Sequence, residues 1–69
     1  MKEYRKRIAE TIVTAREMAN VSQRQLAGLL GRDRRTIQRW ESGEIRLLVE
    51  DYLGIFDVLN VNLELFSKW

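Results

Sequence analysis

A cluster of long hydrogen-bonding side chains lies in the middle of the chain. It consists of Arg34, Arg35, Gln38 and Arg39. An arginine presents a planar fork of N–H donors, which matches the O6 and N7 acceptors of guanine and also the oxygens of phosphate. Ile37 and Trp40 are three residues apart, so a helix turns both toward a core and leaves the cluster on or near the other side. The pattern predicts a helix whose exposed side binds hydrogen-bond acceptors.

A tight turn and a shorter helix precede this cluster. Ser22 is a good N-cap, so we expect a helix to begin at Gln23. Its inward face is expected to contain Leu26, Ala27 and Leu30. Gly31 supplies the positive φ that reverses the chain within about three residues, and Asp33 then caps the next helix. Residues 23–41 therefore resemble two short helices joined by one turn, the arrangement that places a second helix in a DNA major groove.

Two further helices are expected on either side of this pair. Residues 3–19 carry an apolar stripe at helical spacing, made of Tyr4, Ile8, Ile12, Ala15 and Ala19. Asn20, which tolerates the left-handed conformation, ends that helix. The last helix is marked by Leu48, Tyr52, Ile55, Phe56 and Leu59. Leu47, Val49, Leu53 and Val58 lie partly off its stripe, so the helix has more apolar surface than a monomer requires.

The C-terminal residues alternate between apolar and polar side chains. Val61, Leu63 and Leu65 would share one face of a strand over residues 61–65. A capped helical turn that starts at Asn62 is the alternative. We favour the strand, because three successive changes between apolar and polar residues are more than a loop usually shows. Because a single strand is not stable alone, it would pair with a second subunit.

Composition excludes several classes of protein. The 69 residues fit one domain, 1–69, whose thin core hides only about 60% of the unfolded surface. The absence of cysteine and histidine excludes disulfides and the usual zinc sites, and we expect no metal and no cofactor. No segment approaches the roughly 20 apolar residues that cross a bilayer, so no membrane partner is expected and a cytoplasmic, nucleoid-associated protein is predicted.

The charge is divided along the chain. Residues 1–40 hold ten Lys or Arg against four Asp or Glu, whereas residues 41–69 hold two against six. This division predicts a basic face for a polyanion and an acidic part for another partner. An enzyme is not expected, because Asp51, Asp57 and Glu64 lack the spacing of a catalytic carboxylate group.

From Ile12 to about Leu63 the chain resembles the XRE/Cro family of helix-turn-helix regulators, which includes lambdoid phage repressors and many bacterial antitoxins. The resemblance rests on the order and spacing of Arg16, Ser22, Gln23, Leu26, Ala27, Gly31, Thr36, Ile37, Trp40, Glu41 and Gly43. It implies a compact, mainly all-α, lambda-repressor-like domain of four to five helices. One position departs from the pattern, since Arg32 stands where the family has a small aliphatic residue.

The resemblance also implies roles for individual residues. Base contacts fall to Arg34, Arg35 and Arg39, with Thr36 and Gln38 as weaker candidates. Phosphate contacts fall to Gln23, Arg24, Arg32, Ser42 and Arg46. Apart from the resemblance, Lys2, Arg5, Lys6 and Arg7 form an N-terminal basic cluster, which is either solvated or lies along the DNA backbone or in a minor groove. Arg16 and Glu41 are expected to form a partly buried structural ion pair.

Dimerisation is expected through residues of about 47–66. The interface candidates are Leu53, Val58, Val61, Leu63, Leu65 and Phe66. The alternating tail is similar to that of the HipB-type antitoxins, where it forms a two-stranded sheet across the dimer. The predicted function is that of a dimeric regulator, a repressor that binds a palindromic operator in double-stranded DNA. The alternative is an antitoxin or interaction module whose main partner is a toxin or another regulator.

Overall fold

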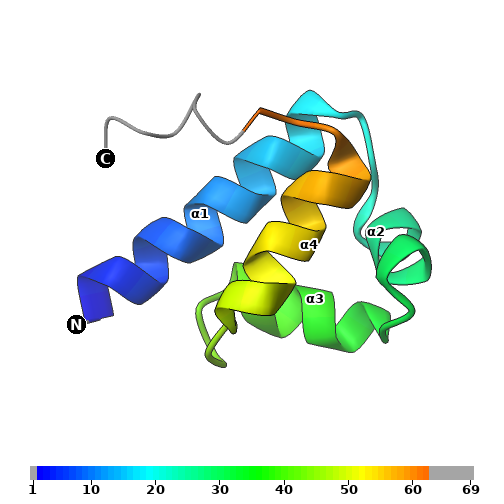
Figure 1. Ribbon diagram of the computed structural model, residues 1–69. Coiled ribbons are helices and arrows are strands. Elements are labelled where there is room, and N and C mark those ends of the chain that lie inside the picture. The colour runs from blue at the N-terminus through cyan, green and yellow to red at the C-terminus, as the bar shows by residue number, and fades with distance from the viewer. Residues whose placement is uncertain (1, 63–69) are drawn as a thin grey trace.

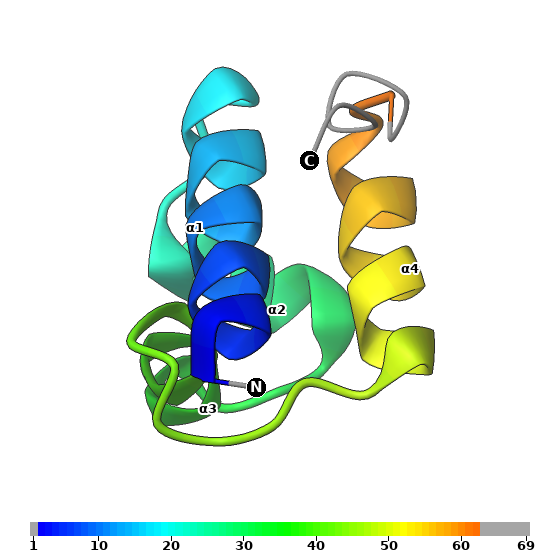
Figure 2. The same cartoon turned by 90° about the vertical axis from the view of Figure 1, so that its left-hand side faces the viewer.

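The computed structural model describes the backbone of residues 2–62 and the side chains of residues 4–62. Within that range the chain forms four helices and no strand: α1 (Lys2–Met18), α2 (Gln23–Leu30), α3 (Arg34–Glu41) and α4 (Val49–Leu59). Helices α1 and α4 lie side by side, and α3 lies across their lower ends (Figures 1 and 2). The all-α class is thus confirmed.

The start of α2 forms as its sequence predicts. Ser22 Oγ accepts a hydrogen bond from the Gln25 backbone N–H at 3.0 Å, and Gln25 Oε1 accepts one from the Ser22 N–H at 2.8 Å. This reciprocal pair satisfies two N–H groups at the helix start. At the other end of α2, Gly31 has a φ of 66°, and its left-handed conformation turns the chain toward α3.

Helix α3 also begins and ends near the expected residues. Asp33 occupies the N-cap position, but its side chain makes no capping hydrogen bond, so the predicted cap is only half right. Ser42 follows the last helical residue, and Gly43, with a φ of 76°, redirects the chain into the loop before α4. The loop crosses below the N-terminal first turn of α1 (Figure 2).

The core takes one large, fully buried aliphatic side chain from each helix. These are Ile12, Leu26, Ile37 and Ile55. Trp40 and Phe56 complete the centre, with 4% and 5% of their surface exposed. Because each such burial contributes about 1.5–3 kcal/mol, the four helices depend on one another for stability.

Three apolar residues on the predicted stripes are exposed. Tyr4 and Ile8 are 61% and 36% exposed because the first turns of α1 extend past the other helices (Figure 1). Leu48 lies outside α4 as its N-cap residue and is 56% exposed. Helical spacing correctly gives the side of a helix on which a residue lies, but it does not show whether a neighbour covers that side.

Helix α4 packs against α1 and α2 and leaves part of its surface open. A Cβ placed on Gly54 would lie 4.0 Å from Leu30 Cδ2, an ordinary contact, so the glycine faces α2. Val49 and Leu53 are 72% and 52% exposed. Val61 and the residue after it are not in a strand, and residues 63–65 of the predicted strand lie outside the described residues.

Two glycines of the α2 region provide a test of the turn. Gly31→Ala should lower the free energy of unfolding by about 1–2 kcal/mol, because a Cβ is strained at positive φ even though nothing lies within 4 Å. Gly28→Ala, inside α2 and equally open, should instead raise it by roughly 0.5–1 kcal/mol. Urea unfolding followed by circular dichroism measures both, and effects of the same sign would contradict the assigned turn.

Candidate nucleic-acid interface

Helix α3 carries the residues that are predicted to contact DNA bases, here called the reading residues. Arg34, Arg35 and Gln38 are exposed, whereas Thr36 and Arg39 are half-buried. On the opposite side, Ile37 and Trp40 are inserted into the core, as their spacing predicts. The guanidinium groups of Arg34 and Arg35 form no ion pair with any described residue. They are available to an external acceptor.

A fork-shaped ion pair holds the C-terminal end of α3 against α1. Arg16 Nε and Nη2 donate to Glu41 Oε2 and Oε1 at 2.7 and 3.0 Å. Arg16 Nη1 also donates to the Val21 carbonyl at 2.9 Å, and Gln23 Nε2 donates to Glu41 Oε1 at 2.9 Å. The two charged side chains are only 15% and 7% exposed. This group of four residues connects α1, the turn after it, α2 and α3.

The hydrogen bond to Glu41 raises the pKa of Arg16 above its ordinary value, and burial opposes the shift. The arginine therefore keeps its charge throughout the physiological pH range. A buried carboxylate beside a permanent cation has its charge compensated, and bidentate geometry is the strongest form of that contact.

Gln23 was expected at a DNA phosphate, yet its amide binds Glu41. The sequence alone does not predict this contact, because 18 residues separate the two side chains and only the fold brings them together. Gln23 remains at the start of α2, where an open groove is lined by Arg16, Ser22, Gln23, Arg24 and Arg34. A phosphate in that groove would meet two exposed guanidinium groups and free N–H groups of the helix start.

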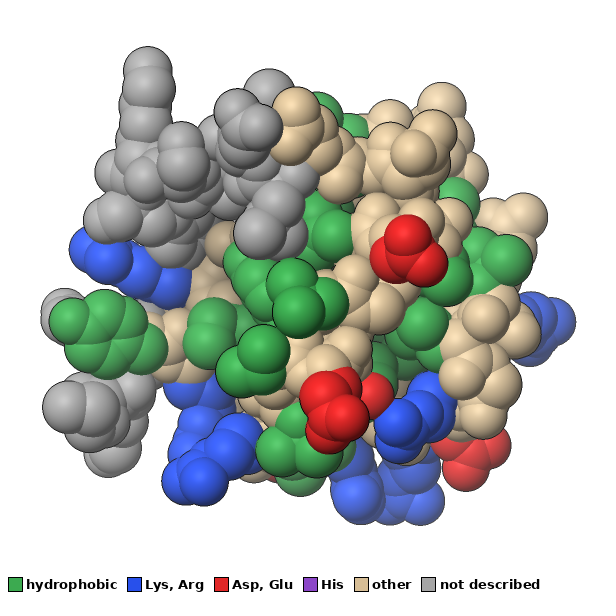
Figure 3. Space-filling model, viewed as in Figure 1, with side chains coloured by type: hydrophobic (Ala, Val, Ile, Leu, Met, Phe, Trp, Pro, Cys, Tyr) green, Lys and Arg blue, Asp and Glu red, His purple; other side chains and the backbone are tan. Residues whose placement is uncertain are grey.

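The opposite flank of α3 carries Ser42 and Arg46, both exposed. Ser42 Oγ donates to the Arg39 carbonyl at 3.1 Å. The Lys and Arg side chains gather along the lower edge of the molecule, the side on which α3 lies (Figure 3). The predicted phosphate contacts, Arg32 excepted, thus lie on both sides of the predicted reading helix.

A comparison with protein families decides the identity. Residues 12–66 match the profile of the helix-turn-helix family of XRE type. The chain belongs to this family of DNA-binding regulators. Searches of characterised proteins and of solved structures find no match.

Two arginines of this XRE-type domain have partners that sequence reasoning missed. Arg39 Nε lies 3.1 Å from Glu44 Oε2, in an exposed pair across the end of α3. Arg32 Nη2 lies 2.7 Å from Asp51 Oδ1, and its guanidinium carbon is 5.8 Å from the centre of the Trp40 ring. Arg32, the departure from the family pattern, therefore joins the turn to α4 instead of pointing freely to solvent.

The predicted dimer contacts are only partly visible. Leu53 is exposed, whereas Val58 and Val61 are half-buried and pack against the core. Leu63, Leu65 and Phe66 lie outside the described residues. Within residues 2–62, no group of acidic side chains could hold a metal ion, and no helix is sufficiently long and apolar to span a membrane.

The ion-pair group predicts a large effect of a conservative change. Arg16→Lys keeps the charge but loses the planar fork, so the free energy of unfolding should fall by about 2 kcal/mol. Arg24→Lys, on the exposed side of α2, is the matched control and should change stability by less than about 0.5 kcal/mol. Chemical denaturation of both variants checks this, and equal stability would show that the fork is not required.

Proposed function

We propose that the protein is a sequence-specific regulator that binds a palindromic operator as a homodimer and represses transcription, acting at the nucleoid in the cytoplasm. The observation that carries the proposal is the arrangement of α3. Its inner side is fixed by the core and by Arg16–Glu41, and its outer side presents two unpaired arginines, Arg34 and Arg35. A rigid helix with exposed arginine forks suits the major groove, where guanine offers two acceptors.

The residues proposed to contact bases differ in their exposure and in whether another side chain of the protein holds them in place. Arg34 and Arg35 are exposed and bind guanine directly. Arg39 is positioned by Glu44, which occupies Nε and leaves the two terminal nitrogens for a bidentate contact. Thr36 meets a thymine methyl group or a phosphate, and Gln38 lies at the edge of the groove. At least one guanine is therefore expected in each half-site.

The proposed phosphate contacts flank this helix. Gln23 and Arg24 hold the backbone at the start of α2, while Ser42 and Arg46 hold it beyond the end of α3. Arg32 joins them only by exchanging Asp51 for a phosphate. Contacts of this class fix the register of the protein on DNA and make binding steeply salt-dependent, without selecting sequence.

The size of the domain suits two copies on successive major grooves. Its longest extent is 29 Å, and half-sites one helical turn apart are separated by about 34 Å. The exposed Val49 and Leu53 of α4 provide apolar surface for the second copy. Hydrophobic side chains gather in the middle of the face that carries α4 (Figure 3).

An antitoxin function is the second candidate. Acidic Glu50 and Asp57 are exposed on the same helix as the exposed apolar residues, so a basic toxin surface is an alternative partner for this helix. The gene beside this one discriminates between the candidates, since a toxin gene favours the antitoxin and phage structural genes favour a phage repressor.

The reading role of α3 is tested by selection from random duplex DNA. The native protein should enrich a palindrome with guanine in each half-site. Arg35→Ala should weaken binding to that site by about 1–3 kcal/mol per half-site and relax the preference at one position. Arg24→Ala should weaken binding to all sequences alike and reduce the salt dependence by about one charge per half-site. Equal weakening on all sequences by Arg35→Ala would remove the base-reading role.

The dimer is tested through α4. Leu53→Glu places a charge in the proposed interface and should shift the protein to monomer in sedimentation equilibrium, with a loss of operator affinity. Leu29→Glu is the matched control, because Leu29 is similarly exposed at 55% but lies on α2. A monomeric native protein, or a dimer that Leu53→Glu leaves intact, would contradict an interface at this position.

A further inference from the structure

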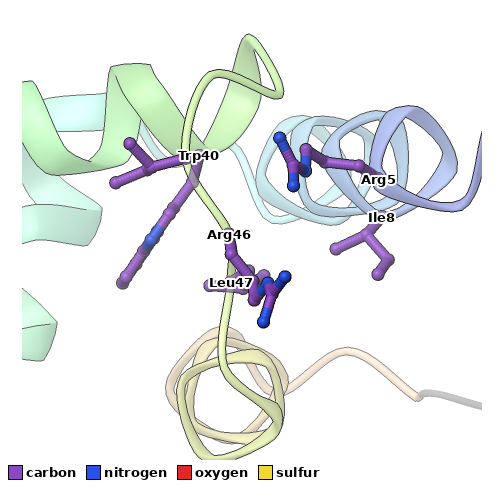
Figure 4. A pocket seen from close by; sticks show the side chains of 6 residues that line it. Arg5, Ile8, Trp40, Arg46 and Leu47 are labelled. Carbon is purple, nitrogen blue, oxygen red and sulfur yellow. The ribbon is translucent and has the colours of Figure 1, made fainter. Parts of the chain in front are cut away.

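A small hollow lies between the first turns of α1, the end of α3 and the loop before α4 (Figure 4). Its volume is about 270 Å³, and six residues line it: Arg5, Ile8, Trp40, Ile45, Arg46 and Leu47. Arg5 and Ile8 extend from α1, while Arg46 and Leu47 extend from the loop, on opposite sides of the same space (Figure 4). A Cβ on Gly43 would lie 4.0 Å from Arg5 Cγ, so the stem of Arg5 runs along the loop.

The lining combines apolar walls with positive charge. Four of the six residues are apolar, and the two polar ones are arginines. Neither Arg5 nor Arg46 forms an ion pair with any described residue. The nearby carboxylate of Glu44 pairs with Arg39 instead. The hollow thus has two guanidinium groups that lack a counter-charge within residues 4–62.

We propose that this hollow binds a small amphipathic anion, a carboxylate with one apolar ring or a short branched chain. The apolar part lies against Ile8, Leu47 and the edge of Trp40, and the carboxylate lies between Arg5 and Arg46. Binding sites for small molecules combine mostly apolar walls with a few placed polar groups, and their usual volumes start near 300 Å³. A ligand of single-ring size fits this hollow, and arginine suits a carboxylate.

The hollow depends on a segment outside the matched part of the family. The match to the family begins at residue 12 of this chain, whereas α1 begins at Lys2. Arg5 and Ile8, which form one wall, belong to the preceding turns of α1. The site therefore combines residues of the matched helix-turn-helix part with two residues that precede the match.

The position of Arg46 gives the ligand a regulatory consequence, which rests on the proposed function. Arg46 is a proposed phosphate contact, and a carboxylate bound to it competes with DNA for the same guanidinium group. Linkage then requires the ligand and DNA to weaken each other's binding. The anion is thus proposed to act as an inducer that releases the operator.

The test of ligand binding uses the free full chain, so that it does not depend on DNA recognition. Isotope-labelled protein is titrated with cyclohexanecarboxylate and followed by two-dimensional amide NMR. We expect saturable shifts of the Trp40 indole N–H and of the Arg46 and Leu47 amides. Neutral cyclohexanecarboxamide tests the charge and acetate tests the apolar part, and each should bind about tenfold more weakly, a loss of about 1.4 kcal/mol.

A matched pair of variants separates this site from general attraction to a basic protein. Arg5→Gln should weaken cyclohexanecarboxylate binding by about tenfold, the effect of about 1.4 kcal/mol from one charge-assisted contact. Arg24→Gln, an exposed arginine on α2, should leave it unchanged. Absence of saturable shifts, equal binding of the carboxamide, or equal effects of the two variants would each overturn the proposal. If Arg5→Gln weakens only DNA binding, the arginine pair serves phosphate and the ligand site is rejected.

The proposed effect of the ligand on DNA binding is measured separately, on the operator obtained by selection from random duplex DNA. Cyclohexanecarboxylate should raise the operator Kd of the native protein, and Arg5→Gln should need about tenfold more of it for the same rise. Saturable ligand binding without any change in operator Kd would keep the site and remove the inducer role. A protein that binds the carboxylate but selects no DNA sequence would reject the proposed function alone.

Discussion

The position of α3 is the constraint on which the rest of the structure depends. A helix of eight residues is too short to be stable in isolation, so it exists only through its contacts with other elements. Ile37 and Trp40 anchor one side in the core, and Glu41 ties its last residue to Arg16. The polar side contributes little to stability, so it can consist almost entirely of the proposed base-contacting residues.

The Arg16–Glu41 contact does more than join two helices. Arg16 also binds the Val21 carbonyl in the turn, and Gln23 binds the same Glu41 carboxylate. The start of α2 and the end of α3 are thus connected through one buried acid. Since the proposed phosphate contacts begin at Gln23 and the proposed base contacts lie on α3, this acid fixes the distance between the two kinds of contact.

Local signals in the sequence account for most of the fold, and they are strongest where one residue type satisfies a backbone requirement. Ser22, Gly31 and Asn20 mark ends of helices because each solves a local problem of hydrogen bonding or positive φ. The exposure of Tyr4 was not predictable in this way, because periodicity gives a direction but no neighbour. The ion-pair partners of Arg32 and Arg39 were also not predictable from the sequence. A long flexible side chain can reach several acidic residues, and only the fold decides which of them it contacts.

The three ion pairs partly cancel the division of charge between the basic first part of the chain and the acidic second part. The acidic residues after residue 40 do not form a separate acidic surface as a whole. Three of them, Glu41, Glu44 and Asp51, each pair with an arginine from the basic part of the chain. The excess positive charge that an anion meets is therefore smaller than the sequence division implies, and within the described residues it lies on basic side chains without an internal partner. Arg34 and Arg35 lie on α3, whereas Arg5 and Arg46 lie around the hollow. Internal pairing thus leaves unpaired positive charge both on the proposed reading helix and beside it, and the proposed competition between ligand and DNA rests on this arrangement.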